Sequence, residues 1–293
     1  MRYLAALLLV LAVPALAADT GLGVGLWGGY ATIQMKELSG MKRDVERFMD
    51  EAINLKGYDI TGGDIGDGYV AGVELGIRTA GGVFKGGDEV RTILRVGYIG
   101  MDDYSLFLTY RGINPGDPAQ NIETRMGIDG WAWAVPVMTG WRYSVPVTDS
   151  LRVGGNLLYG AVVAALGSSQ IQEMRLYDTA WNLKSEKNVA YSPRFMGTGF
   201  GMEAGADVEY RIMEKLWAGV EVGYRYMPVN VRSTRDVDTN NDGDTTDFMT
   251  DNPVAPYDNQ DISKGDAPEN PQNQSFGLDF SGLTVAVRVT QEF

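Results

Sequence analysis

The chain of 293 residues contains neither cysteine nor histidine. Without cysteine it cannot form disulfide bonds, so hydrogen-bonded structure and packing must supply its stability. Without histidine, the commonest general base is missing, together with His-containing catalytic triads and His-ligated zinc sites. We therefore expect a protein that is not an enzyme.

Positive charge and long apolar runs are also scarce. The chain has 25 Lys and Arg against 38 Asp and Glu, a formal net charge of −13. A nucleic-acid-binding protein needs a basic footprint, so the composition excludes that class. No apolar run approaches the about 20 residues that a membrane-spanning helix requires.

The first residues have the pattern of an export signal. Arg2 provides a positive start, Leu4 to Val13 form a short apolar segment, and Ala15-Leu16-Ala17 has the small-x-small form of a signal-peptidase site. The apolar segment is too short to be a transmembrane anchor. The sequence thus predicts a signal peptide over residues 1–17 and a single domain over residues 18–293.

Period-two alternation marks the rest of the chain as β-structure. The alternating stretches cover residues 22–35, 69–78, 90–110, 131–145, 151–166, 198–213, 216–231 and 276–293.

One face of most of these strands is large and apolar, while the other carries glycine, small residues and charges. In a membrane barrel the apolar face meets lipid and the charges turn into the lumen. A slip of one residue would move Arg78 or Arg95 into hydrocarbon, at a cost of about 2 to 4 kcal/mol each near the midplane. The register is therefore strongly specified.

The fourth strand carries three tryptophans on one face, at Trp131, Trp133 and Trp141. This arrangement is unusual for a soluble surface and typical of an interfacial aromatic belt. Pro136 interrupts the strand, and because proline cannot donate to a ladder we expect a β-bulge near it.

The connections alternate between long and short. Long polar loops are expected at residues 36–67, 111–127, 167–197 and 232–275, and short links join the other strands. This rhythm predicts an antiparallel up-and-down transmembrane β-barrel of about eight strands with both termini at the short-turn end. Ten strands result if residues 171–183 and 188–195 form a separate hairpin; we favour their being continuations of strands five and six.

The last strand turns Leu283, Val285, Val287 and Val289 outward and ends at Phe293. With the signal peptide and the hairpin pattern, it resembles the small outer-membrane β-barrels of the OmpA transmembrane-domain and OmpW type. The resemblance implies the outer membrane of a Gram-negative bacterium, long loops on the extracellular side, and Phe293 as an assembly signal read by the barrel-assembly machinery. It also implies contact with outer-membrane lipid and lipopolysaccharide.

Two functions fit this resemblance. The first is a structural or surface-interaction role without catalysis. The alternative is a narrow channel for ions or small apolar solutes, as the OmpW group implies. Enzymes among outer-membrane barrels look to histidine, which this chain lacks.

Charged residues on the inward faces form the first candidate site. An eight-stranded barrel is just wide enough for side chains to fill, so a satisfied plug is favoured over an ion gate. The expected network comprises Glu74, Arg78, Arg95, Arg142, Arg152, Glu203, Asp207, Glu221, Arg225 and Arg288.

The last long loop offers a second candidate site, for Ca²⁺. Its D-x-N-x-D-G core spaces oxygen ligands as calcium loops do, but Met249 stands where an EF-hand has glutamate. A solvated Asp/Asn/Gly turn fits the residues equally well. The expected ligands are Asp238, Asn240, Asp242, Asp244 and Asp247.

A helical pattern occurs within the first long loop, over residues 40–56. Apolar residues recur at helical spacing opposite charged ones, with Ser39 as the expected N-cap and Gly57 as the stop. We expect a short helix that covers the barrel mouth with its apolar face.

The calcium hypothesis predicts weak binding, with a dissociation constant of about 10⁻⁴ to 10⁻³ M. Titration calorimetry of the wild type and of an Asp242→Ala, Asp244→Ala double variant tests it. Identical heats for the two proteins up to millimolar calcium would reject the site.

Overall fold

The structure is a computed structural model in which every strand belongs to one antiparallel sheet. It describes residues 21–47, 49–50, 57–63, 67–81, 87–101, 104–191, 194–233 and 275–293. Its elements are β1 (Leu22–Thr32), α2 (Lys36–Arg47), β2 (Tyr58–Gly62), β3 (Asp67–Gly81), β4 (Glu89–Met101), β5 (Tyr104–Ile113), β6 (Asn121–Thr148), β7 (Leu151–Tyr177), β8 (Leu183–Tyr191), β9 (Arg194–Met213), β10 (Leu216–Tyr226), β11 (Pro228–Ser233), β12 (Ser275–Asp279) and β13 (Gly282–Glu292).

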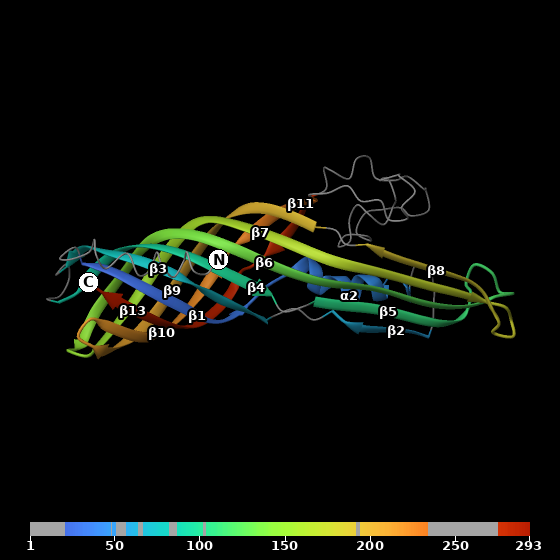
Figure 1. The fold of residues 1–293 in the computed structure, drawn as a ribbon, viewed down its shortest axis with the longest axis horizontal. Coiled ribbons are helices and arrows are strands. Elements are labelled where there is room, and N and C mark those ends of the chain that lie inside the picture. The colour runs from blue at the N-terminus through green and yellow to red at the C-terminus, as the bar shows by residue number, and fades with distance from the viewer. Residues whose placement is uncertain are drawn as a thin grey trace, which may run out of the picture.

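Eight of these strands close into a ring, in the order β1-β3-β4-β6-β7-β9-β10-β13 and back to β1. The first and last ring strands meet with Leu26 opposite Val289. Closure pairs the backbone groups of each ring strand on both sides, which hydrocarbon requires. The predicted eight-stranded antiparallel barrel is confirmed, and Figure 1 shows its tilted strands.

The two faces of the ring strands differ as the alternation predicted. Apolar and aromatic side chains such as Leu94, Val220 and Val287 are exposed on the outside, while Arg95, Glu221 and Arg288 are buried inside. Tyr69 stacks on Tyr98, with ring centroids 5.8 Å apart, and aromatic contacts continue around the outer face from Tyr98 to Trp133.

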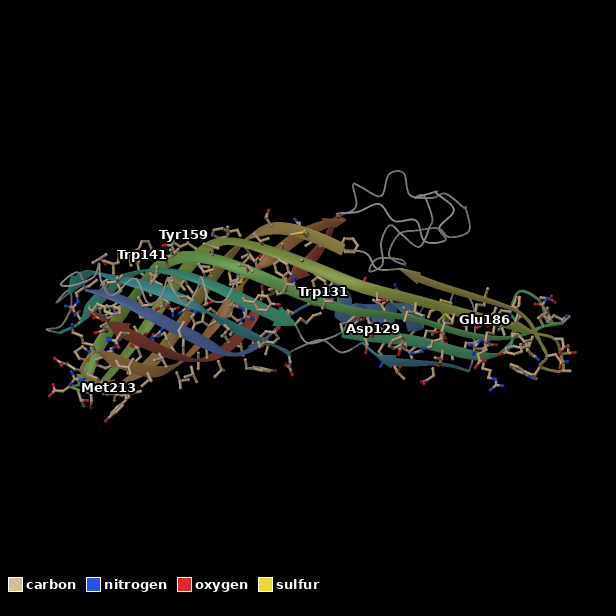
Figure 2. The ribbon with its side chains drawn as sticks, viewed as in Figure 1. Asp129, Trp131, Trp141, Tyr159, Glu186 and Met213 are labelled. Atoms are coloured by element: carbon tan, nitrogen blue, oxygen red, sulfur yellow. The ribbon has the colours of Figure 1, made fainter. Side chains whose placement is uncertain are left out.

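The outer face of β6 changes character at one point. Trp141 and Trp131 point outward from the barrel, whereas Asp129, the next outward residue, is a charge (Figure 2). Tryptophan marks the membrane–water interface, so the strand leaves the lipid between Trp131 and Asp129. The residues before Asp129 therefore stand in water.

Two ring strands continue far beyond the barrel. β6 and β7 are 28 and 27 residues long, against the about 9 to 11 that cross a bilayer. Their upper parts pair with each other, β5 pairs with β6, β2 pairs with β5, and β8 pairs with β7. We call the upper parts of β6 and β7 together with β2, β5 and β8 the extension sheet; it occupies the right half of Figure 1.

The extension sheet changes how two expected loops are described. Residues 111–127 and 167–197 consist largely of paired strand rather than loop. The hairpin of β7 and β8 stands above the ring and adds no strand to it, so the count in the ring is eight and not ten. Of the long loop at 232–275, residues 234–274 lie outside the described part of the chain.

The helix exists, but its predicted start is wrong. α2 begins at Lys36, so Ser39 lies inside its first turn and is not the N-cap. A glycine inside a helix lowers the stability of that helix by about 1 kcal/mol. α2 continues through Gly40 all the same, because the apolar side of the helix packs on the sheet and stabilises it. Val45 packs against the buried clusters that contain Leu106 and Leu108 of β5.

The second half of the helix predicted over residues 40–56 is described only in part. Met49, in a short continuation of the helix, is buried with Leu108 and Tyr110 on the inner face of the extension sheet. Residues 51–56 lie outside the described part, and Gly57 has a left-handed φ of 82°. Within the described residues, no helix is long and apolar enough to cross a membrane.

The β-bulge expected at Pro136 is also wrong. β4 pairs with β6 in one constant register from Glu89 to Gly100, and only the rungs at Gly97 and Tyr98, opposite Pro136 and Val135, are missing. The missing N–H interrupts the ladder without shifting it. The register shift occurs after Pro146 instead, next to the turn into β7.

The lipid-facing assignment predicts the effect of a charge on β13. Val287 is 59% exposed at the centre of that strand, so Val287→Arg should lower the unfolding free energy by about 2 to 4 kcal/mol. Ile113→Arg, on the outer face of β5 beyond the membrane, is the matched control and should change stability by less than about 0.5 kcal/mol. Denaturant titration of the barrel refolded in lipid vesicles measures both; equal effects would contradict the membrane boundary.

Candidate functional site

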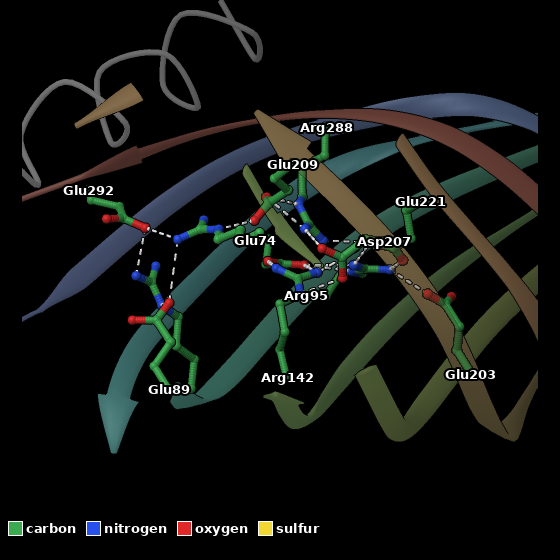
Figure 3. A network of polar contacts seen from close by, with 12 residues as sticks. Glu74, Glu89, Arg95, Arg142, Glu203, Asp207, Glu209, Glu221, Arg288 and Glu292 are labelled. Atoms are coloured by element: carbon green, nitrogen blue, oxygen red, sulfur yellow. Dashed lines mark hydrogen bonds and ion pairs between the residues drawn. The ribbon is translucent and has the colours of Figure 1, made fainter. Parts of the chain in front are cut away.

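Acidic and basic side chains are buried together inside the barrel, and Figure 3 shows the polar contacts among most of them. Carboxylates and guanidiniums occur there in equal number. The carboxylates are Glu74, Glu89, Glu203, Asp207, Glu209, Glu221 and Glu292, and the guanidiniums are Arg78, Arg91, Arg95, Arg142, Arg152, Arg225 and Arg288.

The centre of this network is Arg95 on β4. Its guanidinium donates to Glu74 at 2.7 Å, to Glu221 at 2.8 Å and to Glu203. Arg142 on β6 shares two of these carboxylates, donating to Glu74 and Glu221 at 3.2 Å. Glu74 and Glu221 therefore each pair with more than one arginine, and these contacts connect β3, β4, β6, β9 and β10 across the lumen.

A second arginine connects the other side of the ring. Arg288 on β13 donates to Glu221 at 2.6 Å, to Glu209 at 2.7 Å and to Asp207 at 2.8 Å. Its side chain is only 1% exposed. Removing one partner of such a buried set leaves an uncompensated charge, which is strongly destabilising.

Toward the short-turn end the network becomes more open to water. Glu292 pairs with Arg91 and Arg152, each at 2.6 Å, and Glu89 pairs with Arg91 and Arg78, each at 2.7 Å. A cavity of about 440 Å³ opens beside these residues at the mouth of the barrel. Water from this side reaches the network at Glu89 and Glu292.

The structure places the predicted inward charges as follows. Nine of the ten join the ion-pair network, and Arg78 does so from the exposed rim through Glu89. Arg225 stands apart: it donates to Thr284 Oγ1 at 2.5 Å and to the carbonyl of Thr32 at 2.9 Å.

Sequence reasoning missed four members of the network: Glu89, Arg91, Glu209 and Glu292. The signal was present for all four, because an even spacing along a strand returns to the same face. Glu89 lies six residues before Arg95 on the same strand. Arg91 lies four residues before Arg95, Glu209 two after Asp207, and Glu292 four after Arg288.

The other half of the interior is apolar, which sequence reasoning did not anticipate. Its side chains come from most of the ring strands and are almost fully buried. They include Ala31, Val70, Ile99, Ala134, Met138, Leu158, Val162, Leu166, Met227 and Phe280. We call this group the apolar layer. It separates the ion-pair network from the extension sheet.

Trp27 marks the boundary between the two halves. The guanidinium of Arg95 lies over its ring, 4.9 Å from the centroid. The indole fits against two glycines: a Cβ on Gly72 would stand 2.8 Å from Trp27 Nε1, and one on Gly97 would stand 2.9 Å from Trp27 Cζ2. Glycine at these two inward positions is therefore required by the close approach of the indole ring.

Little empty space remains inside the network. A cavity of about 10 Å³ lies beside Arg91, Ile93 and Arg142, enough for about one water molecule. Several buried polar atoms nonetheless lack a hydrogen-bond partner, among them both amide atoms of Asn156 and the hydroxyl of Thr290. These atoms are places where single waters can bind.

Outside the membrane, the outer face of the extension sheet carries alternating charges. Arg111, Glu123 and Arg175 lie opposite one another on β5, β6 and β7, and Arg125 and Glu173 form the next row. A groove of about 380 Å³ runs over these rows. Glu186 on β8 extends the first row and pairs with Arg175 at 3.0 Å; Figure 2 shows Glu186 far from the barrel.

The turn from β7 to β8 holds Trp181 at the tip of the extension sheet. Asp178 organises the turn: its carboxylate accepts from the backbone N–H groups of Ala180 and Asn182 and from the side chain of Asn182. The Asn182 side-chain hydrogen bond and those backbone bonds hold the pKa of Asp178 below its usual range. Trp181 has a φ of 64°, a left-handed conformation that bulky residues rarely adopt.

The predicted calcium ligands, Asp238 to Asp247, lie outside the described residues, so the structure does not test them. In the part of the chain that is described, no three Asp or Glu residues are arranged to hold a metal ion.

A closed antiparallel ring with a lipid-facing apolar surface and inward charges defines a transmembrane β-barrel. The family model described as outer membrane protein beta-barrel domain matches residues 3–250. The chain belongs to this family and is an outer-membrane β-barrel. The resemblance to small outer-membrane barrels is thereby confirmed at family level.

Solved structures that are similar to this chain include three outer-membrane or surface proteins. The outer membrane protein OprG from Pseudomonas aeruginosa is 11% identical, with a TM-score of 0.35, covering 94% of this chain and 96% of that one. Neisserial surface protein A is 9% identical, with a TM-score of 0.29 and coverage of 93% and 97%. The outer membrane protease OmpT from Escherichia coli is 9% identical, with a TM-score of 0.25 and the same coverage. No curated protein sequence matches.

The network predicts a strong coupling between two of its members. Arg95→Met should cost about 3 to 5 kcal/mol, because Glu74, Glu203 and Glu221 lose their shared partner. Adding Glu203→Gln removes one of the orphaned charges, so the double variant should be less destabilised than the sum of the two single variants. Arg175→Met, at an exposed ion pair of the extension sheet, is the control and should cost at most about 1 kcal/mol. Additive effects of the first two changes, measured by denaturant titration, would show that the network is not coupled.

Proposed function

We propose that this protein is a non-enzymatic, closed outer-membrane barrel that anchors a rigid extracellular sheet for interaction at the cell surface. The observation that carries the proposal is the filling of the lumen by two different layers, the ion-pair network and the apolar layer. Short turns face the periplasm in barrels of this kind, so the extension sheet stands outside the cell.

The apolar layer supports closure more strongly than the charges do. An ion-pair network contains polar groups that water and small ions can displace, and it is wetted from the periplasmic mouth. The side chains of the apolar layer offer no such groups, and its members Met227, Phe280 and Val162 are fully buried. Dewetted apolar constrictions are barriers to ions.

The construction of the extension sheet supports a role at the surface. It is joined to the barrel by unbroken strands, so it has little freedom to bend away. Its inner face is covered by Val45 and Met49 of the helical segment, and its outer face is left to water. A sheet held in this way presents fixed side chains to whatever meets the cell surface.

The absence of histidine in the whole sequence supports the non-enzymatic part of the proposal. Export by the signal peptide over residues 1–17 and recognition of the C-terminal strand by the assembly machinery belong to the proposal too. Phe293 donates its backbone N–H to the carbonyl of Leu22 at 2.9 Å, so the last residue lies at the seam that closes the ring.

A narrow channel for ions or small apolar solutes is the second candidate function. The unpaired polar atoms of Asn156 and Thr290 favour it, because they allow water among the buried charges. To conduct, the barrel would still have to open the apolar layer.

Conductance of the refolded full-length barrel in planar bilayers separates the two functions. We expect no stepwise current in the wild type, and discrete openings in a Met227→Ala, Phe280→Ala variant that leaves a gap in the apolar layer. Heat-dependent gel mobility confirms that both proteins are folded. Reproducible wild-type openings that disappear on changing Arg95 or Arg288 would establish the channel instead.

A further inference from the structure

The groove on the outer face of the extension sheet has a defined set of polar side chains. We call it the outer groove and define it by Asp59, Arg111, Glu123, Arg125, Glu173 and Arg175. These residues come from β2, β5, β6 and β7 and share one face of the sheet. Three are basic and three acidic, so the groove has no net charge.

Two arginines of the outer groove are fixed by aromatic rings. The guanidinium of Arg111 lies 4.7 Å from the ring centroid of Trp181, and that of Arg125 lies 4.7 Å from that of Phe107. A stacked guanidinium uses its flat face on the ring and keeps its N–H edge free to donate. The groove therefore contains hydrogen-bond donors held in place before any ligand arrives.

Free acceptors lie among these donors. Over the described ranges of the chain, the carboxylates of Asp59 and Glu173 take part in no hydrogen bond or ion pair. Glu123 accepts one hydrogen bond, from Tyr177 at 2.9 Å, and has capacity for more. Donor and acceptor positions alternate from strand to strand, at the about 4.8 Å spacing of a sheet.

Trp181 gives a second, independent observation. The hydrogen bonds around Asp178 hold this tryptophan in a left-handed backbone conformation. The residue is 39% exposed, and its ring contacts Arg111 and Tyr177. Ile113 and Leu183, at the same tip, are 61% and 55% exposed. The exposed part of this ring adds an aromatic surface next to Arg111, in a residue with a strained backbone.

We propose that the outer groove binds a neutral, hydroxyl-rich saccharide. A hydroxyl both donates and accepts, so it matches carboxylates and guanidiniums that alternate. A ligand with a full charge would meet groups of its own sign at each step across the groove. The volume of about 380 Å³ lies within the range of about 300 to 1,000 Å³ for small-ligand pockets.

This inference rests on the proposed function, since it names a ligand for the surface that the barrel presents. Cross-strand charge pairs alone would stabilise the sheet without any ligand. That reading leaves the carboxylates of Asp59 and Glu173 without a partner among the described residues.

The test is binding of maltotriose and of N-acetylchitotriose to the full-length barrel refolded in lauryldimethylamine oxide, a detergent without sugar. Calorimetry gives the affinity, and the fluorescence difference between wild type and Trp181→Phe isolates the signal of Trp181. We expect saturable binding of at least one trisaccharide. Glu173→Gln and Arg125→Met should each weaken it by at least about tenfold, the loss typical of a hydrogen bond to a charged group. Glu214→Gln, in an exposed periplasmic turn, should leave it unchanged.

Two further probes identify the source and the chemistry of the ligand. If purified lipopolysaccharide binds and the trisaccharide displaces it, the natural ligand is a saccharide of the protein's own membrane. If the trisaccharide binds and lipopolysaccharide does not, the natural ligand comes from outside the cell. Both outcomes support the proposal. Heparin or triglycine binding more tightly than either trisaccharide would overturn it, as would no binding of either up to 50-fold molar excess over about 1 mM protein. A barrel that binds no saccharide and conducts no ions leaves the proposed function standing and rejects only this inference.

Discussion

Buried charge must be balanced inside this barrel, and the rest of the structure depends on that balance. A ring of eight strands leaves room for side chains and almost none for water. Arginines such as Arg95 and Arg288 can stay ionised there only because several carboxylates surround each of them. Because the partners lie on several strands of the ring, the network also fixes the relative register of those strands.

Along the lumen, charged side chains of the ion-pair network give way to apolar side chains of the apolar layer, and this change explains how the barrel can be closed. Trp27 covers the last guanidinium of the network, and the apolar layer continues from its far side. The same cluster of buried residues includes Leu106 of β5, and Ile60 of β2 and Val45 of α2 pack against it. The extension sheet is therefore packed on the barrel rather than only tethered to it. A continuous core from the lumen to the extracellular side is what makes a rigid surface platform possible.

Much of the fold could be predicted from the sequence, because lipid imposes a strict alternation on each strand. Arg78 and Arg95 could face only inward, and the rhythm of long and short links set the strand count. The extension sheet was harder, because in water a strand need not alternate: residues 111–127 read as a polar loop yet are mostly paired strand. The start of α2 was missed because the packing of Val45 on the sheet, a tertiary contact, outweighs the local cost of Gly40.

The site was predicted in part for the same physical reason. Inward charges could be found by parity, and the four that were missed obey that parity too. Parity also places Val70 and Met138 on the inward face, but it does not show that such residues from different strands lie at one level of the lumen and form the apolar layer. The outer groove depends on pairing between β5, β6 and β7 that no local pattern contains.

Closure by a dry apolar layer is the central claim, and cysteine accessibility tests it most directly, because the chain has no native cysteine. Two variants, Val162→Cys in the apolar layer and Val147→Cys at the periplasmic mouth, would each be placed in lipid vesicles. Each would then be treated with a membrane-impermeant thiol reagent, applied in turn to both sides of the vesicles. The account predicts rapid labelling of the cysteine at 147 from the periplasmic side and none of the cysteine at 162 from either side. Rapid labelling at 162 in the folded barrel would contradict it.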